Sequence, residues 1–172
     1  LVLGGSQGAQ SLNTALPEVL RRRGARLDVV VRHQCGARHF DKARAAYMNA
    51  GIEAEVVPFE DDMAAAYAWS DLVICRSGAL ALAELEAAGV PSILVPYPHA
   101  VDDHQTRNAE AMVAAGAARL VAGGEDFVKR LGATFEDIGR RETLVRMANA
   151  ARALAHPDAA RRIADACLEV AA

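Results

Sequence analysis

The chain contains few cysteines and few aromatic residues. Its three cysteines, Cys35, Cys75 and Cys167, are too few and too scattered for a disulfide framework, which favours a reducing, cytoplasmic environment. Aromatic residues make up 5% of the chain and apolar residues 52%, many of them alanine. This balance argues against a β-sandwich and favours a helix-rich α/β domain, for which 172 residues supply an adequate core.

Positive charge and long apolar runs are also lacking. The formal net charge of −3 gives no basic surface of the kind that binds nucleic acid. No run approaches the roughly 18 apolar residues of a membrane span, and no signal peptide is visible, so we expect no transmembrane segment. His33, Cys35 and His39 lack a second ligand pair at zinc spacing, so the sequence predicts no metal site and no cofactor.

Strand and helix patterns alternate along the chain. Strand-like apolar runs are predicted at 1–3, 27–31, 54–57, 71–75, 92–95 and 118–121. Helices are predicted between them at 8–22, 37–50, 61–69, 78–88 and 103–115, and three more follow near 125–131, 140–154 and 158–171. Strands separated by single helices predict right-handed crossovers and a doubly wound, Rossmann-like parallel sheet. Because the chain starts inside its first strand, we expect it to be a piece of a longer polypeptide.

Four predicted loops carry glycine or polar residues at the carboxyl edge of this sheet, where such folds bind ligands. They cover residues 4–8, 58–62, 76–78 and 96–105. The first loop (GGSQG) is neither a Walker A loop nor a full G-x-G-x-x-G, so it is equally consistent with a tight turn and with phosphate contact. His99 and His104 are candidates for acid–base groups or for ordinary hydrogen-bonded loop residues, and Asp103 is predicted as a helix N-cap.

The segment 75–84 (CRSGALALAE) places a predicted helix directly after a strand. Ser77 is predicted as its N-cap, so the first free backbone N–H groups and the positive end of the helix dipole would favour a phosphate. At about 100° per residue, Ala81 and Glu84 fall on the stripe of Ser77, whereas Glu86 points away. Glu84 lies about 10 Å further along, which suits a diphosphate at the cap and a ribose diol at the carboxylate. Spacing alone nevertheless favours an ordinary solvent-exposed carboxylate.

Four segments form a co-linear set of motifs. They are GGSQGA at 4–9 with Leu12 and Asn13, FEDDMAAAYA at 59–68, CRSGA at 75–79 with Glu84, and VPYPH at 95–99 with Asp103, His104, Gln105, Asn108 and Ala109. In this order and spacing they closely resemble the MurG family, the GlcNAc transferases that make lipid II in peptidoglycan synthesis. The resemblance covers nearly the whole chain and is weaker at 122–172.

The resemblance implies one half of a two-domain GT-B glycosyltransferase. Residues 1–172 would be the C-terminal UDP-GlcNAc-binding domain, and residues 158–171 would form a terminal helix that packs toward an N-terminal domain absent from this chain. The family moves GlcNAc from UDP-GlcNAc to the C4 hydroxyl of lipid I, with inversion, at the cytoplasmic face of the plasma membrane. Acceptor and membrane contacts, and the general base, would belong to the N-terminal domain.

The resemblance also implies individual roles for residues of this chain. Phe59 and the backbone of Glu60, with Met63 close by, would hold the uracil, and Glu84 would bind the ribose hydroxyls. Gln105, with His104 beside it, would bind GlcNAc hydroxyls. Ser6 and the backbone around Gly78, Ala79, Leu80 and Ala81 would hold the diphosphate, and Arg76 and Ser77, which precede this helix start, are expected at the same site. Family members often carry Thr or Ser where Ala81 stands, so a hydroxyl contact to phosphate would be missing here.

Two other functions are compatible with the same fold. The first is a free-standing UDP-sugar-binding subunit of a two-chain glycosyltransferase. The second is a UDP-sugar epimerase, which needs acid–base groups at C2 of the sugar, and the four motifs supply no clear set of these.

Overall fold

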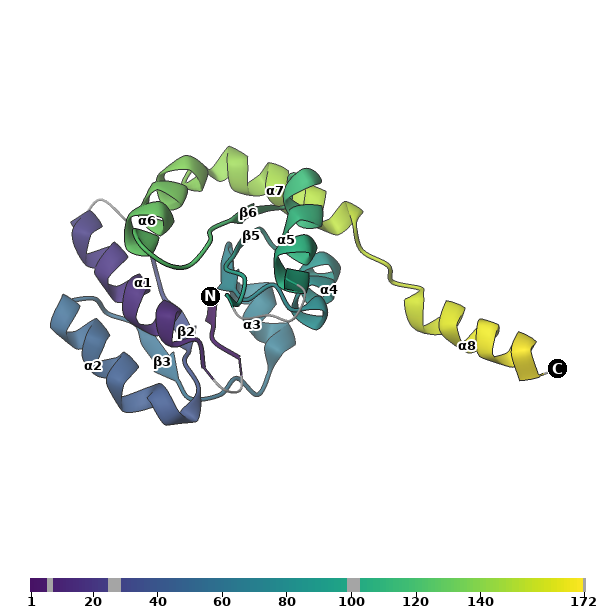
Figure 1. Cartoon of the computed structure of the whole chain (residues 1–172), viewed down its shortest axis with the longest axis horizontal. Helices are drawn as coiled ribbons and strands as arrows, with labels where there is room; N and C mark the ends of the chain where they lie inside the picture. Colours follow the sequence, from purple (N-terminus) through teal and green to yellow (C-terminus); the bar gives the residue numbers. More distant parts are fainter. Residues whose placement is uncertain (6–7, 25–28, 99–102, 172) are drawn as a thin grey trace.

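The computed structural model describes residues 1–172 apart from 6–7, 25–28, 99–102 and 172. Its strands form one parallel sheet in the order β3-β2-β1-β4-β5-β6 (Figure 1). The strands are β1 (Val2–Leu3), β2 (Arg32–Gln34), β3 (Glu55–Val57), β4 (Val73–Cys75), β5 (Ser92–Leu94) and β6 (Ala118–Leu120). The order reverses between β1 and β4, so the predicted doubly wound α/β sheet is confirmed.

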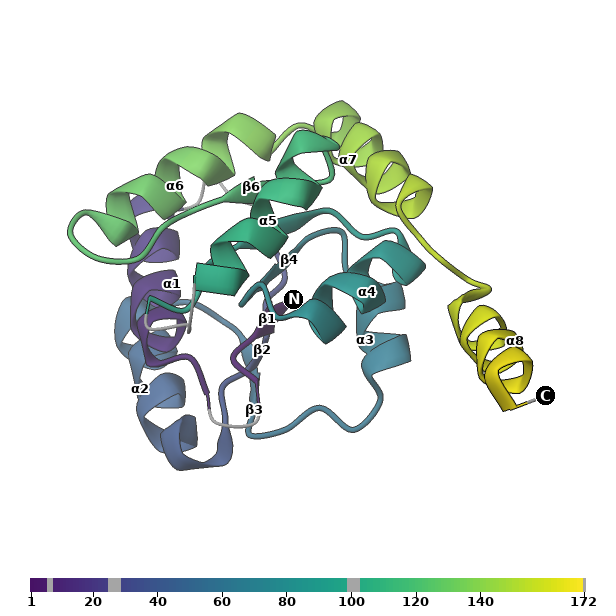
Figure 2. The ribbon, with the colours of Figure 1, turned by 45° about the vertical axis from the view of Figure 1, so that its right-hand side comes forward.

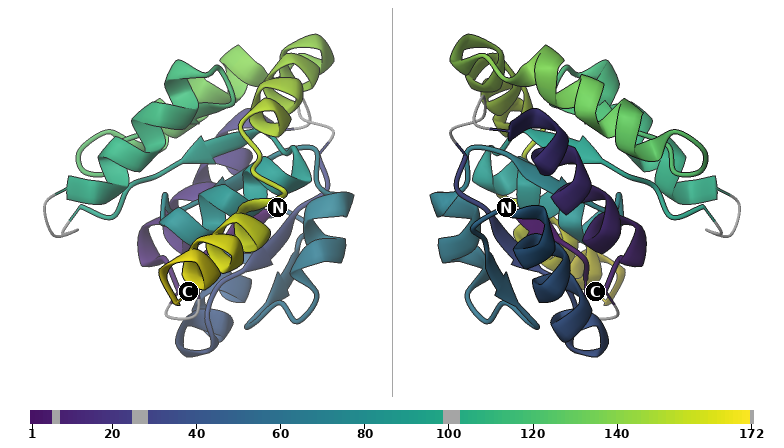
Figure 3. Two further views of the ribbon diagram at one scale, coloured as in Figure 1. Left: turned by 90° about the vertical axis from the view of Figure 1, so that its right-hand side faces the viewer. Right: turned by 90° about the vertical axis from the view of Figure 1, so that its left-hand side faces the viewer.

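Helices follow most of the strands and cover both faces of the sheet. The elements are α1 (Gln10–Arg23), the 3₁₀ turn η2 (Ala37–His39), α2 (Phe40–Ala50), α3 (Met63–Trp69), α4 (Ala79–Ala88), α5 (His104–Ala114), α6 (Phe127–Ile138), α7 (Arg141–Ala153) and α8 (Ala159–Ala171). Figure 2 shows α1, α2 and α6 on one side of the strands and α3, α4 and α5 on the other. In Figure 3, the right-hand view brings the purple and blue helices α1 and α2 to the front.

Successive residues of the central strands face two separate cores. Val2 and Ile74 pack in one core with side chains of α1, α2 and α6, whereas Leu3 and Cys75 pack in the other with side chains of α3, α4 and α5. Buried parallel strands need apolar residues on both faces because helices cover both. The loops that follow the strands therefore lie at the edge of the sheet, between the two layers of helices.

The last helix lies apart from this body. In Figures 1 and 2, α8 extends beyond α7, and its side chains from Ala159 to Val170 are exposed. Ile163, Leu168 and Val170 are 65%, 70% and 91% exposed, so apolar surface is left uncovered on this helix. No helix within the described ranges is long and apolar enough to cross a membrane.

The predicted strand at 27–31 was wrong over residues 29–31, which form no strand, whereas residues 27–28 lie outside the described residues. The second strand is Arg32–Gln34, and the parallel register pairs Val2 with His33 and Arg32 with Glu55. His33 and Gln34 are polar yet buried, because groups from distant segments of the chain satisfy their hydrogen bonds. The local sequence pattern therefore does not predict that they belong to a buried strand. Most other predicted strands and helices are confirmed with bounds that differ by a residue or two. The helix predicted at 37–50 is divided into η2 and α2, which begins at Phe40, and α6 continues to Ile138.

Candidate functional site

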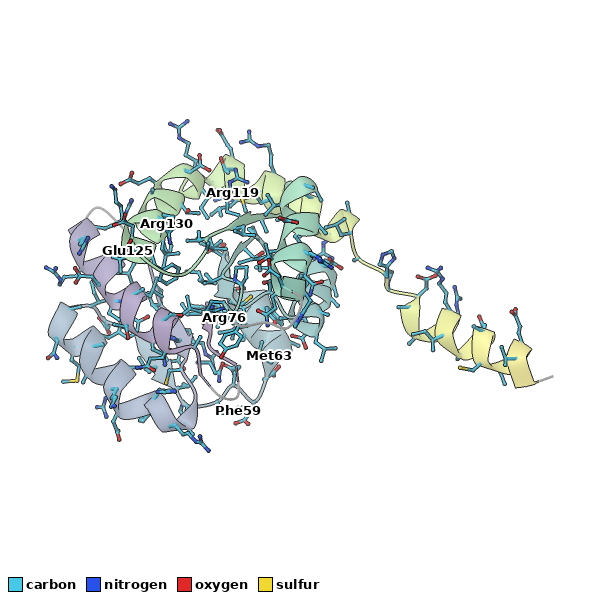
Figure 4. All side chains as sticks on the ribbon, viewed as in Figure 1. Phe59, Met63, Arg76, Arg119, Glu125 and Arg130 are labelled. Carbon is cyan, nitrogen blue, oxygen red and sulfur yellow. The ribbon has the colours of Figure 1, made fainter. Side chains whose placement is uncertain are left out.

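A pocket of about 310 Å³ opens at the carboxyl edge of the sheet, where β1 and β4 lie side by side. The strand order reverses at this point, which is where doubly wound sheets bind ligands. Figure 4 labels Phe59, Met63 and Arg76, three side chains from different segments that face this pocket. Its full lining is Leu3, Gly4, Gly5, Gln34, Phe59, Glu60, Met63, Tyr67, Cys75, Arg76, Gly78, Ala81, Glu84 and Gln105.

Gly4 and Gly5, from the glycine loop, line one side of the pocket. Gly5 has a φ of 75°, in the left-handed region, and its carbonyl oxygen accepts a hydrogen bond from the Gly8 N–H at 2.9 Å. A Cβ at Gly8 would overlap the Cys35 carbonyl oxygen and lie 2.6 Å from the His39 ring, so glycine is needed there for space. Ser6, the predicted diphosphate contact in this loop, lies outside the described residues, as does His99.

The amino end of α4 forms the opposite wall. The prediction that Ser77 caps this helix was wrong, because Gly78 occupies the N-cap position. Ser77 is fully buried, and its hydroxyl has no hydrogen-bond partner among the described residues. The first intrahelical bond runs from the Leu82 N–H to the Gly78 carbonyl at 3.1 Å. The backbone N–H groups of residues 79–81 therefore have no acceptor within the helix and carry its positive dipole end.

The side chains of this first turn differ in their position. Ala81 lines the pocket, whereas Ala79 and Leu80 are exposed outside it, and Leu80 is 83% exposed. Only backbone groups of Ala79 and Leu80 can therefore serve an anion at this helix end. That is the form in which the sequence predicted their contribution.

Glu84 lies further along the same side of α4 and is held by Tyr67. The buried Tyr67 hydroxyl donates a hydrogen bond to Glu84 Oε2 at 2.8 Å. Burial, together with the adjacent Glu84 carboxylate, raises the pKa of Tyr67, so the phenol stays a donor. The carboxylate is exposed and lines the pocket, with a second oxygen available for a diol.

The loop after β3 brings Phe59, Glu60 and Met63 to the pocket. The Phe59 ring is 60% exposed, whereas Glu60 is 7% exposed and forms an ion pair with Arg32, from its Oε2 to the Arg32 Nε at 2.9 Å. This ion pair commits the Glu60 carboxylate to the protein. Asp62 then caps α3 by accepting a hydrogen bond from the Ala65 N–H at 2.9 Å.

Arg76 joins the pocket to the loop after β5. Its guanidinium donates to the carbonyl oxygens of Val95 at 3.1 Å and Pro96 at 2.8 Å, and it lies over the Tyr97 ring at 5.6 Å. Burial lowers the pKa of Arg76, which nevertheless stays positively charged at neutral pH. It thus adds positive charge beside the amino end of α4 while its hydrogen bonds hold the neighbouring loop.

The predicted sugar residues begin α5. Gln105 lines the pocket, and its Oε1 accepts a hydrogen bond from the Tyr97 N–H at 2.9 Å, which directs the amide. Asp103 occupies the N-cap position as predicted, but its side chain accepts from the Thr106 hydroxyl at 2.6 Å and makes no capping bond to the backbone. His104 is exposed and does not line the pocket.

Sequence reasoning missed Gln34 and Tyr67 as pocket residues and Arg32 as the partner of Glu60. Tyr67 stands inside one of the four motifs, and Gln34 ends a strand whose position was misassigned. A strand extended to Gln34 would have placed this residue at the ligand edge. The pairing of Tyr67 with Glu84 had no signal in the sequence, because it joins two different helices.

His33 belongs to the core. Its Nδ1 and Nε2 lie 2.8 Å from the Tyr47 hydroxyl and 3.0 Å from Asn13 Oδ1, so both ring nitrogens are satisfied by protein groups. Within the described ranges, no three His, Cys, Asp or Glu side chains come close enough to hold a metal ion.

A groove with a larger volume, about 620 Å³, lies at the opposite edge of the sheet, at the amino ends of β1 and β4. Most of its lining residues are Leu, Val, Ile and Phe, and Trp69 and Asp71 also line it. Its described lining residues include no convergent set of polar groups that could orient a ligand. The smaller pocket at the carboxyl edge is therefore the better candidate site.

Comparison with known proteins assigns the chain to a family. Residues 1–163 match the glycosyltransferase family 28 C-terminal domain. The chain belongs to this family. A curated relative from Pseudomonas aeruginosa (strain UCBPP-PA14), named UDP-N-acetylglucosamine--N-acetylmuramyl-(pentapeptide) pyrophosphoryl-undecaprenol N-acetylglucosamine transferase, is 52% identical over 99% of this chain and 48% of its own length. The family 28 domain described here thus spans about half the length of the curated relatives it matches.

Solved structures agree with the family 28 assignment. The crystal structure of Acinetobacter baumannii MurG matches with a TM-score of 0.89 and 38% identity, over 98% of this chain and 51% of that one. These matches confirm the resemblance to MurG and the GT-B half-fold. A UDP-GlcNAc 2-epimerase from Neisseria meningitidis, bound to UDP-GlcNAc, matches with a TM-score of 0.65 over 98% of this chain and 43% of that one, but at 12% identity it shares the fold alone.

Proposed function

We propose that this chain binds UDP-GlcNAc and forms the donor half of a transferase that moves GlcNAc to the C4 hydroxyl of lipid I, giving lipid II. The observation that carries the proposal is one pocket that joins the glycine loop, the amino end of α4 and Glu84. A second support is the 52% identity to transferases with this activity in their names. The epimerase alternative has fold similarity alone behind it, and the free-standing subunit has no observation in its favour.

The diphosphate is assigned to the space between the glycine loop and α4. Gly4, Gly5 and Gly78 line this space without side chains, so phosphate oxygens can approach the unpaired backbone N–H groups at the amino end of α4 closely. The N–H groups of Gly4 and Gly5 already donate to Gln34, so these glycines contribute space and not donors. Ser6 and the backbone of residues 79–81 complete the proposed contacts, with Ser77 buried beneath them. The positive charge of Arg76 lies at the same edge.

The nucleoside and the sugar are assigned to the two ends of the pocket. Glu84 would accept hydrogen bonds from the ribose diol, while the Phe59 ring, the Glu60 backbone and Met63 would hold the uracil. On the other side, the Gln105 amide would bind GlcNAc hydroxyls, with His104 close by in the first turn of α5. The ion pair between Arg32 and Glu60 supports a role for the Glu60 backbone, because its carboxylate is already used.

The site favours departure of UDP. As the bond from the anomeric carbon to the diphosphate breaks, negative charge grows on the phosphate oxygens. The N–H groups and dipole of α4 would stabilise that charge without reorganisation. The acceptor hydroxyl also needs a general base near the anomeric carbon, and we assign that base to the N-terminal half.

The remaining parts of the whole protein follow from the same proposal. Residues 1–172 would be its C-terminal domain, and the N-terminal domain would bind lipid I at the cytoplasmic face of the plasma membrane. The relatives' names support a membrane substrate because undecaprenol is a long lipid. The exposed stripe of α8, formed by Ile163, Ala166, Cys167 and Val170, would pack toward the N-terminal domain.

Calorimetry with nucleotides tests the donor assignment. The chain should bind UDP and UDP-GlcNAc more tightly than ADP and GDP. The reason is that the loop with Phe59 and Glu60 would recognise uracil partly through its backbone groups. Gln105→Ala should leave UDP affinity nearly intact and remove the extra affinity that GlcNAc contributes. Equal affinity for the three diphosphates would remove the uracil assignment, and an absence of UDP binding would overturn the proposed function.

A further inference from the structure

The side chain of Gln34 binds both backbone polar groups of Gly5. Gln34 Oε1 accepts a hydrogen bond from the Gly5 N–H at 3.0 Å, and Gln34 Nε2 donates to the Gly5 carbonyl at 2.9 Å. The same Nε2 lies 3.4 Å from the Pro58 carbonyl oxygen. Gln34 is 4% exposed and lines the pocket.

These partners determine the orientation of the amide. An N–H group needs an acceptor and a carbonyl needs a donor, so rotating the amide by half a turn would oppose donor to donor and acceptor to acceptor. A glutamine meets both requirements at once. A glutamate of the same length could accept from the Gly5 N–H but could not donate to the Gly5 carbonyl.

The amide continues the sheet beyond its last backbone pairing. The Gly4 N–H donates to the Gln34 carbonyl at 2.8 Å, and the Gln34 side chain then pairs with the next residue, Gly5. Gln34 thereby joins the loop after β1 to the start of the loop after β3. In the proposed complex, these two loops contact the diphosphate and the uracil.

The glycine loop needs such a tether. Glycine loses more conformational freedom than other residues when it is ordered, and Gly5 and Gly8 both hold positive φ values, of 75° and 76°. Gly5 is exposed, and a Cβ there would meet no atom of the described residues within 4 Å. Its two hydrogen bonds to Gln34 and its turn bond to Gly8 therefore restrain this residue.

We propose that Gln34 is a positioning residue that holds Gly5, at the start of the glycine loop, in the place that accepts the donor diphosphate. This inference rests on the proposed function, since it assigns the phosphate end of the same pocket. Gln34 acts through Gly5, so its loss should weaken binding of the phosphate part of the ligand and spare the nucleoside part.

The test compares UDP with uridine in the 172-residue chain and its variants. Gln34→Met keeps the length of the side chain and removes both hydrogen bonds, and should lower UDP affinity about tenfold by calorimetry. Uridine affinity, measured by NMR titration, should stay within about twofold. Gln34→Glu restores one hydrogen bond but adds a negative charge beside the diphosphate, and should lower UDP affinity more than Gln34→Met does, with a loss that shrinks at high salt.

Two further measurements separate positioning from general destabilisation. Ile138→Val weakens the core at the opposite edge of the sheet, where Ile138 is 1% exposed, and should lower the unfolding temperature without changing UDP affinity. Amide exchange should show a protected Gly5 N–H in the parent chain and faster exchange in Gln34→Met, with or without ligand.

The outcomes distinguish this inference from the proposed function. If the parent chain binds UDP and Gln34→Met binds it equally well, or loses uridine affinity to the same extent, the role of Gln34 is overturned while the donor assignment stands. If the parent chain does not bind UDP, the donor assignment fails. Independently of UDP binding, an unchanged exchange rate of the Gly5 N–H in Gln34→Met would refute the proposed restraint of Gly5 by Gln34.

Discussion

Glu84 lies on the exposed side of α4, where one carboxylate oxygen already accepts a hydrogen bond from Tyr67 at 2.8 Å. Glu84 also lines the pocket, so this bond restrains a carboxylate that is part of the site. At the scale of single residues, the site is therefore built from a group that would touch the ligand and a buried group that directs it. Each makes a separate prediction.

Glu84→Ala should weaken UDP binding by about 1.5–3 kcal/mol, because hydrogen bonds from the ribose diol to a charged acceptor are lost. Calorimetry measures the difference directly. Glu86→Ala removes a carboxylate from the same helix outside the pocket lining and should have little effect. Equal losses in the two variants would remove the ribose assignment.

Tyr67→Phe should weaken UDP binding less, by about 0.5–1.5 kcal/mol, because Glu84 remains but loses its orienting bond. In the Glu84→Ala background, the same substitution should cost nothing further in UDP affinity, which a double-mutant cycle measures. Tyr47→Phe is the matched control, since it removes a buried hydroxyl that bonds His33 instead. Additive losses from Tyr67→Phe and Glu84→Ala would contradict a shared role.

At the scale of elements, a buried polar network ties β2 to the helices beneath it. His33 bonds Asn13 of α1 and Tyr47 of α2, and the Asn13 Nδ2 donates to the Cys35 carbonyl at 3.0 Å. Because Asn13 Oδ1 must then accept, His33 carries its proton on Nε2 and accepts from Tyr47 at Nδ1. The network holds the histidine neutral.

The network predicts loss of stability in acid. Burial lowers the pKa of His33 from 6.5 to about 4, so the unfolded chain binds the extra proton first as the pH falls. The free energy of unfolding should fall by about 3 kcal/mol between about pH 6.5 and pH 4, then change no further from this cause. Urea unfolding at a series of pH values measures it.

His33→Gln is the control for this pH range, because glutamine keeps a hydrogen-bond donor and acceptor but has no group that ionises. Its unfolding free energy should depend less on pH between about 6.5 and 4. Hydrogen bonds from Arg21 and Arg22 lower the pKa of Glu18 from 4.5 to about 2. The contribution of this carboxylate to the free energy of unfolding is therefore lost at a lower pH than that of His33. An unchanged pH dependence in His33→Gln would assign the acid sensitivity to other groups.

At the scale of the whole molecule, the chain combines the proposed donor pocket with a terminal helix whose described side chains are exposed. Its family relatives are about twice as long, and α8 leaves its apolar stripe exposed. A transferase needs donor and acceptor in contact, and the proposed division assigns them to different halves. This division can be measured.

The 172-residue chain should bind UDP and be almost inactive on lipid I. Fusion to an N-terminal domain from a MurG relative should restore transfer, because that domain would supply the acceptor site and the general base. Transfer of labelled GlcNAc to lipid I is the assay. Turnover by the isolated chain on the order of 1 per second or more, a rate typical of enzymes, would refute the division.

The amino-acid sequence by itself determined the alternation of strands and helices, the parallel sheet and the placement of Glu84 on the pocket side of α4. These properties depend on local periodicity: helix geometry places residues three and four apart on one face wherever the helix packs. The four motifs also identified the family, because their order and spacing are properties of the sequence itself.

Tertiary structure alone decided the position of β2, the inward turn of Ser77, the pairing of Tyr67 with Glu84 and the binding of Gly5 by Gln34. Each of these depends on contact between segments that are distant along the chain. Polar residues such as His33 and Gln34 can enter a buried strand only because partners from other elements satisfy them, and those partners are in place only once the strands have taken their register.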